Sequence, residues 1–355
     1  MIDKEKLTID WINIVSKEKR NADKILVEKV IRALLLLEGL VLQNLSFVFK
    51  GGTALMLHLN SSKRLSIDID IIIPAKPDNL DELLNKLASE QGFLRKELKQ
   101  RNVNSKIDKA HYKFFYNPLF KTRKDEEYVL LDILFEKVQY CNLVGLNIQS
   151  SFLPENREIL SVKSPSVEDI TGDKLTAFAP NTTGIPYFKK EDSMSMEIVK
   201  QLYDLGNLVD NVSDLESIKT TFKKFAKTEL DYREMVTLSE QDVLEDIFQT
   251  ALCVVTRGAD GKGDFEQLQQ GIQRVTRFVF SESYHIEKAI THASKIAYLA
   301  TLIKHDSQTL EKYDNPSQMK DWLISEPMNT KLNRLKKSNP EAFYYWYKIF
   351  QLETN

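Results

Sequence analysis

The sequence has few of the residues that would place it in several common classes of protein. Its 355 residues include only two cysteines, 12 glycines and 10 prolines. Cys141 and Cys253 lie far apart and outside any metal-ligand spacing, which excludes both a disulfide framework and a cysteine-based zinc site. The sequence therefore indicates a protein of a reducing compartment.

Neither a charge excess nor a long apolar run is present. The 49 Lys+Arg residues oppose 51 Asp+Glu residues, for a formal net charge of -2. This excludes binding of nucleic acid through overall positive charge, because phosphate affinity comes from neutralising several phosphates. The longest apolar runs, residues 33–37 and 67–74, fall far short of the roughly 20 residues of a membrane span. With a charged N-terminus that lacks a signal-peptide core, we expect a cytoplasmic protein with no membrane contact.

The first half of the chain mixes strand and helix patterns. Apolar residues at helical spacing alternate along the chain with short β-branched runs. The predicted elements are helices over residues 24–45 and 77–90 and strands over residues 46–50, 65–73, 109–116 and 127–135. We predict an α+β fold, with a sheet domain over residues 1–165.

The second half of the chain loses the strand signal. Ser166 and the acids after it resemble a helix start, and helices are predicted over residues 170–179 and 194–208 and through most of the remaining chain. We expect an all-helical domain over residues 166–355, with the active site between the two domains.

Three aspartates are the candidate metal ligands. Asp68 and Asp70 lie two apart on a predicted strand, so their side chains leave the same face. Their mutual repulsion is relieved by a divalent cation, and hard oxygen ligands suit Mg²⁺, with Mn²⁺ as its substitute. Asp132 is the third ligand if its strand lies next to theirs; otherwise it is a strand-edge carboxylate paired with a lysine.

A glycine pair before a predicted helix suggests a phosphate site. Glycine backbone and a helix N-terminus allow close approach of N–H groups to an anion, and Ser66 shares the strand face of the aspartates. The candidate nucleotide-binding residues are Lys50, Gly51, Gly52, Thr53 and Arg64. The five histidines, His111 among them, show no metal-ligand spacing and are interpreted as structural.

At these residues the sequence resembles a known family. Lys50-Gly51-Gly52-Thr53-Ala54-Leu55 followed by Arg64-Leu65-Ser66-Ile67-Asp68-Ile69-Asp70 is similar to the signature of the AbiEii/AbiGii toxins, nucleotidyltransferases of the polymerase-β-like superfamily that includes the MenT toxins. Asp173-Lys174-Leu175-Thr176-Ala177 and Lys200-Gln201-Leu202-Tyr203-Asp204-Leu205 resemble two later family segments.

The resemblance implies a Mg²⁺-dependent transfer of NMP from an NTP, with loss of pyrophosphate. It implies that Asp68, Asp70 and Ser66 act in catalysis together with Lys174, which would meet the β- and γ-phosphates, and with Asp204. The implied acceptor is the 3′ end of tRNA. The implied role is a growth-inhibiting toxin of a type IV toxin–antitoxin or phage abortive-infection system, with a cognate antitoxin as partner.

Two alternatives remain open at this point. The acceptor could be a protein hydroxyl or a small molecule, or the chain could bind nucleotides without turnover. Local basic clusters are either solvated faces or contacts for an RNA backbone. They comprise Arg95, Lys96, Lys99, Arg101, Lys106 and Lys109; Lys121, Arg123 and Lys124; and Lys331, Arg334, Lys336 and Lys337.

Overall fold

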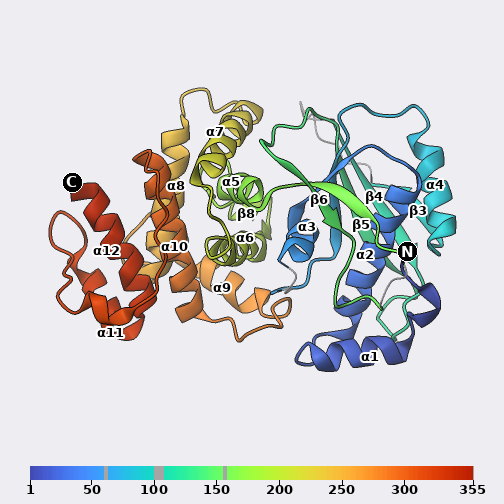
Figure 1. Cartoon of the computed structure of the whole chain (residues 1–355), viewed down its shortest axis with the longest axis horizontal. Helices are drawn as coiled ribbons and strands as arrows, with labels where there is room; N and C mark the ends of the chain where they lie inside the picture. Colours follow the sequence, from blue (N-terminus) through green and yellow to red (C-terminus); the bar gives the residue numbers. More distant parts are fainter. Residues whose placement is uncertain (60–62, 100–107, 155–157, 355) are drawn as a thin grey trace. The chain divides into compact units, whose positions relative to one another are not determined.

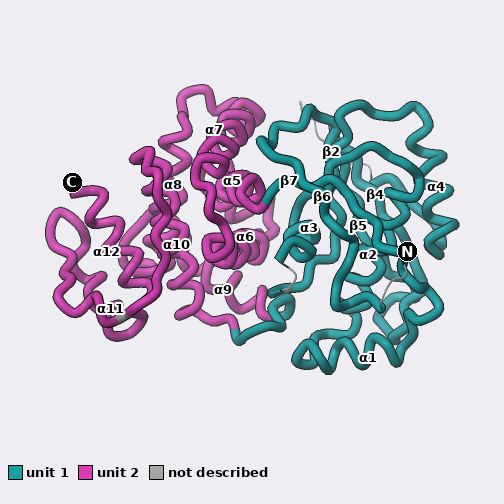
Figure 2. Tube along the Cα trace, viewed as in Figure 1, with its two compact units in different colours: residues 1–166, 277–283 teal, residues 167–276, 284–355 magenta. Residues whose placement is uncertain are grey.

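A computed structural model describes residues 1–59, 63–99, 108–154 and 158–354 (Figure 1). Arg101 and Lys106 lie outside the described residues. The chain forms two compact units: residues 1–166 with 277–283, and residues 167–276 with 284–355 (Figure 2). A mixed sheet is followed by a mainly helical unit, which confirms the predicted fold class.

A five-stranded sheet, in the order β1-β2-β5-β4-β3, forms the centre of the first unit. β2 runs parallel to β5, and the other neighbouring strands are antiparallel. The strands are β1 (Val48–Lys50), β2 (Asp68–Ile72), β3 (Arg95–Leu98), β4 (Lys109–Tyr116) and β5 (Glu127–Leu134). Four of the five were predicted, and the edge strand β3 was not.

Helices cover one face of this sheet. α2 (Lys24–Leu42) contacts β2, β5 and α4 (Leu80–Glu90). Twelve of its residues are buried, as the wide apolar face predicted. α1 (Ile9–Glu18) packs on α2, and α3 (Gly51–His58) follows β1 directly. The apolar core therefore lies between α2 and the sheet.

A short hairpin and a distant segment complete the first unit. β6 (Leu143–Asn147) and β7 (Ser161–Pro165) pair antiparallel, and neither was predicted. Residues 277–283 return from the second half of the chain: Arg64 forms a β-bridge with Val279, and the Leu65 N–H donates to the Phe278 carbonyl at 2.8 Å. This segment was predicted to belong to the helical domain over residues 166–355.

The second unit is helical apart from one hairpin of two-residue strands, β8 (Phe188–Lys189) and β9 (Asp192–Ser193), which corrects the all-helical prediction. Its helices are α5 (Val167–Ala177), α6 (Ser195–Leu208), α7 (Leu215–Tyr232), α8 (Glu240–Val255), α9 (Phe265–Val275), α10 (Ile286–Lys304), α11 (Leu335–Ser338) and α12 (Pro340–Thr354). α5 and α6 confirm the helices predicted over residues 170–179 and 194–208. Within the described ranges, every helix falls short of the length or the apolar character that crossing a membrane requires.

Candidate active site

A row of polar residues crosses one face of the sheet. Lys50 of β1 lies opposite Asp70 of β2, Asp70 opposite Asp132 of β5, and Asp132 opposite His111 of β4. Register partners in a sheet point to the same face, so strand pairing places these four side chains side by side. The strand of Asp132 thus lies next to the strand of Asp68 and Asp70. The prediction of Asp132 as a third metal ligand required this neighbourhood.

Asp68 lies on the same face of β2 as Asp70, two residues before it. The side chains of Asp68 and Asp70 share a face because they lie two apart on β2. Ile69 and Ile71, between and after them, are 0% and 1% exposed on the helix-covered face. Burial of these two isoleucines fixes the strand's orientation, so both carboxylates are directed to the polar face.

Gly51 and Gly52 form a close-packed turn against this polar face. Gly51 has a φ of +81°, which favours glycine, and an added Cβ there would lie 2.1 Å from Asp70 Oδ2. An added Cβ at Gly52 would lie 2.7 Å from Ser66 Oγ and 2.9 Å from Arg64 Nη2. The absence of side chains at the two glycines therefore lets the functional groups of Asp70, Ser66 and Arg64 lie close to the backbone at the start of α3.

The first turn of α3 is suited to an anion. The Lys50 side chain makes no capping hydrogen bond, and the N–H groups at a helix start attract negative charge. Thr53 is fully buried, and its Oγ1 donates to the Asp68 carbonyl at 2.6 Å. Its hydroxyl thus ties the helix to β2, so any contribution of Thr53 to nucleotide binding comes from its backbone.

Two cations flank the glycine turn. Lys50 Nζ lies 5.6 Å from the centroid of the Tyr140 ring, a cation–π distance that restrains the ammonium group. Arg64 Nη1 donates to the Leu65 carbonyl at 3.1 Å, while Nη2 is the group near Gly52. Positive charge is thereby placed beside the two glycines, where phosphates would be cradled.

Asp132 is bonded to a histidine. His111 Nδ1 and Asp132 Oδ1 are 2.6 Å apart, and the two side chains are 13% and 34% exposed. The alternative with a lysine partner is therefore not what the structure shows. A carboxylate–imidazole pair can accept a proton from a hydroxyl, which is the chemistry of a general base. The contact between His111 and Asp132 was not predicted, because only the register of β4 on β5 reveals it.

The arrangement of the carboxylates limits how they could hold a metal ion. Among the described residues, no group of three or more His, Cys, Asp or Glu side chains is placed to hold a metal ion. The three predicted ligands therefore do not form a closed cage. The pair Asp68 and Asp70 fits an ion such as Mg²⁺, which keeps several waters and completes its shell with substrate phosphates.

Lys174 and Asp204 are bonded to each other in the second unit. Lys174 Nζ of α5 lies 2.9 Å from Asp204 Oδ2 of α6 and donates to Gln201 Oε1 at 3.0 Å. The side chains of Lys174 and Asp204 are 10% and 4% exposed. The two residues singled out by the resemblance thus form one buried ion pair, and their relation to the nucleotide stays a prediction.

Comparison with known families decides the chain's membership. A family model described as "Nucleotidyl transferase AbiEii toxin, Type IV TA system" matches residues 35–275, more than half of the chain. The chain belongs to this AbiEii family. It is accordingly a nucleotidyltransferase, and the resemblance noted in the sequence is confirmed. The match contains β1, β2 and β5, and also α5 and α6 with Lys174 and Asp204.

Solved structures give weaker likenesses to this AbiEii protein. JHP933 from Helicobacter pylori matches with 16% identity and a TM-score of 0.42, over 79% of this chain and 90% of that one. A second H. pylori structure gives 17% identity and a TM-score of 0.42, over 81% and 97%. An antigenic nucleotidyltransferase-like protein from Paracoccidioides brasiliensis gives 14% identity and a TM-score of 0.34, over 61% and 94%. A search of curated proteins found no match.

Proposed function

We propose that this AbiEii protein transfers NMP from an NTP to the 3′ end of tRNA and so inhibits growth. The observation that carries the proposal is the polar row on the sheet, with the glycine turn packed against Asp70. It combines paired carboxylates with a helix start that favours phosphate. The basic clusters along the chain support an RNA acceptor.

Each candidate site residue of the first unit has a role in this proposal. Gly51 and Gly52 receive the triphosphate against the start of α3, with Lys50 and Arg64 offsetting its charge. Ser66 hydrogen-bonds a phosphate oxygen. Asp68 and Asp70 hold a divalent cation, proposed to be Mg²⁺, which when bound lowers the charge on the phosphates.

The transfer forms one phosphorus–oxygen bond and breaks another. The acceptor hydroxyl oxygen bonds to the α-phosphorus, the bond from that phosphorus to the bridging oxygen of the β-phosphate breaks, and pyrophosphate leaves. The hydroxyl proton moves to a base, a role that we assign to Asp132; its contact with His111 and its register opposite Asp70 support this assignment. We assign Lys174 and Asp204 to nucleotide binding on the family match alone.

A transfer assay tests this function. Purified protein with Mg²⁺, each labelled NTP in turn and total RNA should give labelled tRNA, whereas Asp70→Asn should give none. Asp78→Asn removes an equal charge at an exposed position shortly after β2 and should retain activity. Growth inhibition on expression should be relieved by Asp70→Ala and not by Asp78→Asn.

Other outcomes would select the alternatives. Label on protein or on a small molecule, with none on RNA, would move the acceptor to a protein hydroxyl or that molecule. NTP binding by calorimetry without pyrophosphate release for any acceptor would show a binding module without turnover. Equal labelling by wild type and Asp70→Asn would refute the assignment of the site.

A further inference from the structure

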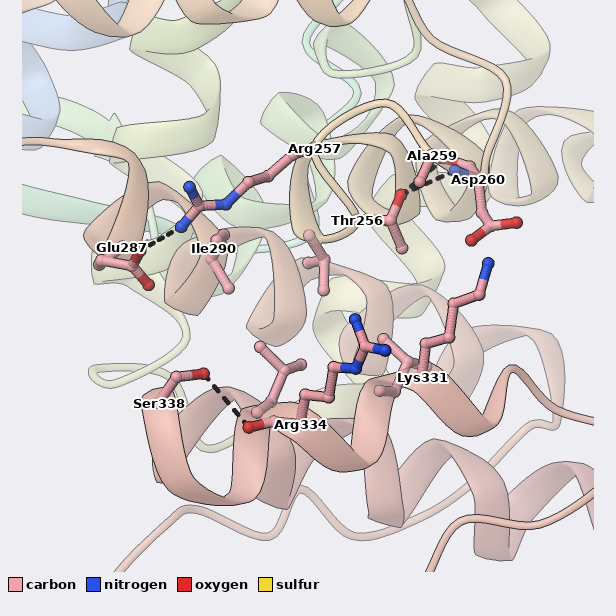
Figure 3. Close-up of a pocket in the computed structure, with 12 residues that line it drawn as sticks. Thr256, Arg257, Ala259, Asp260, Glu287, Ile290, Lys331, Arg334 and Ser338 are labelled. Atoms are coloured by element: carbon pink, nitrogen blue, oxygen red, sulfur yellow. Dashed lines mark hydrogen bonds and ion pairs between the residues drawn. The ribbon is translucent and has the colours of Figure 1, made fainter.

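The second unit contains a pocket that the transfer reaction does not use. It has a volume of about 280 Å³ and is lined by the end of α8, the loop that follows it, the start of α10 and the segment 331–338 (Figure 3). Its apolar wall includes Val255, Ile290 and Leu335, while Thr256 and Ser338 add hydroxyls. A pocket that combines an apolar wall with a few polar groups is typical of a small-ligand site.

Local helix geometry directs two cations into this pocket. The 3₁₀ helix at Thr330–Arg334 begins at an Asn329 cap, whose side chain accepts from the Lys331 N–H at 3.0 Å. A 3₁₀ helix has three residues per turn, so Lys331 and Arg334 share one face. Figure 3 shows both side chains extending toward Thr256 and Asp260.

The charges of the lining leave these two cations available. Arg257 is paired with Glu287, and Asp260 accepts from Asn329 Nδ2 at 2.8 Å. In the part of the chain that the structure describes, neither the Lys331 ammonium nor the Arg334 guanidinium forms an ion pair. The lining thus carries three cations, Arg257, Lys331 and Arg334, against the two carboxylates of Glu287 and Asp260, and its net charge is positive.

The four residues of the C-terminal basic cluster, Lys331, Arg334, Lys336 and Lys337, differ in their contacts. Lys336 Nζ donates to the carbonyls of Lys320 and Trp322, at 2.5 and 2.9 Å, and so stabilises the chain around it. Lys337 is exposed and does not line the pocket. Of these four residues, only Lys331 and Arg334 line the pocket. The cluster is therefore not a uniform solvated basic face.

Arg257, which also lines the pocket, has an unusual backbone conformation. It follows α8 with a φ of +55°, in the left-handed region, where glycine is preferred at a helix end. An arginine there is conformationally costly. Its side chain lines the pocket and is fixed by Glu287, so the backbone conformation places a third cationic group at the rim.

We propose that this pocket binds a nucleotide phosphate, with Lys331 and Arg334 as its ligands and the wall of Val255, Ile290 and Leu335 against the sugar or base. The guanidinium fork and the ammonium group match phosphate oxygens. The phosphate belongs to a free nucleotide or to an RNA chain, which the experiment distinguishes. The inference does not depend on the proposed transfer to tRNA.

Titration of the full chain tests the site without NTP or metal. The probes are inorganic phosphate, the four nucleoside monophosphates and a short single-stranded RNA, each followed by calorimetry at low and moderate salt. At least one probe should bind, and the double variant Lys331→Ala/Arg334→Ala should weaken that binding about ten- to a hundredfold, as expected for lost charge-assisted bonds. Arg334→Lys should retain part of the affinity, and Lys337→Ala, a matched charge loss in the same segment, should bind as wild type.

The outcomes distinguish a free nucleotide from RNA as the source of the phosphate. They also distinguish failure of the pocket proposal from failure of the transfer proposal. Binding of monophosphates shows a free-nucleotide site, and binding of RNA alone shows a contact for the RNA backbone. Absence of binding by all probes, or equal binding by the double variant, overturns the proposal. Asp70→Asn should leave pocket binding intact, so loss of transfer in that variant and loss of binding in the double variant report on different sites.

Discussion

Replacing Gly51 by alanine should slow nucleotide transfer about a hundredfold at a modest cost in stability. The added Cβ would lie 2.1 Å from Asp70 Oδ2 and 2.8 Å from Asp70 Cγ. Real Cβ contacts do not occur at such distances, so a group must move. The obstacle is the end of a side chain, and the carboxylate can rotate away more easily than the backbone can shift. The substitution therefore displaces the carboxylate that we propose as a metal ligand in the transfer.

The two effects differ in size. A residue with a side chain at the φ of +81° costs about 1–2 kcal/mol. For a unit of this size that lowers the melting temperature by about 2–8 °C. Displacing a positioned catalytic group by about 1 Å costs on the order of a hundredfold in rate. Activity should therefore fall far more than the stability loss can explain.

Gly92→Ala supplies the matched control. Gly92 also has a positive φ, of +76°, but an added Cβ there meets nothing within 4 Å. Gly92→Ala should thus lose similar stability and keep wild-type activity. Thermal unfolding and labelled-NTP transfer are measured on both variants. If Gly51→Ala transfers label as fast as Gly92→Ala, the packing of the glycine turn on Asp70 is not required for the reaction, and the site assignment fails.

Three further predictions follow from contacts away from the glycine turn. His111→Ala removes the bond to Asp132 and should slow transfer about ten- to a hundredfold with unchanged melting temperature; a wild-type rate would contradict a role for the pair. Lys174→Ala removes the ion-pair partner of the buried Asp204 and should cost about 3–5 kcal/mol in urea unfolding. Adding Asp204→Ala should recover part of this loss rather than add to it. Asp214→Ala should cost about 1 kcal/mol at pH 7, because Asp214 caps α7. Hydrogen bonds from the Ser217 hydroxyl and, second, from the Ser217 backbone N–H lower the pKa of Asp214 in the folded state. The stability that Asp214 contributes is therefore present above its unfolded-state pKa and is lost as the pH falls through its folded-state pKa. If wild type and Asp214→Ala still differed in unfolding free energy at pH 2, this reasoning would be contradicted.

Much of the sheet was predictable because burial imposes a period on the sequence. The alternation around Ile69 and Ile71 identified β2 and the face of its aspartates, and the apolar run around Leu131 identified β5. Helix α2 was predictable for the same reason, since its apolar residues recur at helical spacing. Asp68, Asp70 and the glycine pair could be named as candidates because their chemistry is visible in the residues themselves.

What escaped prediction depends on partners that are distant in sequence. β3 is charged and mostly exposed, as edge strands often are, so it carries no apolar alternation. His111 was set aside because its pairing with Asp132 is a property of strand register. The pairing of Lys174 with Asp204 likewise arises from the packing of α5 on α6, which spacing along the chain does not encode.

The return of residues 277–283 to the first unit has a consequence for synthesis. The segment supplies the backbone partner of Arg64 and Leu65, and Ser281 Oγ donates to the Lys63 carbonyl at 2.9 Å. On a ribosome that adds ~5–20 residues per second, several seconds separate the emergence of Ser166 from that of Ser283. A nascent chain thus carries its complete glycine and aspartate motifs before the support for Arg64 exists. Full assembly of the proposed phosphate-binding side of the site waits until most of the chain has been made.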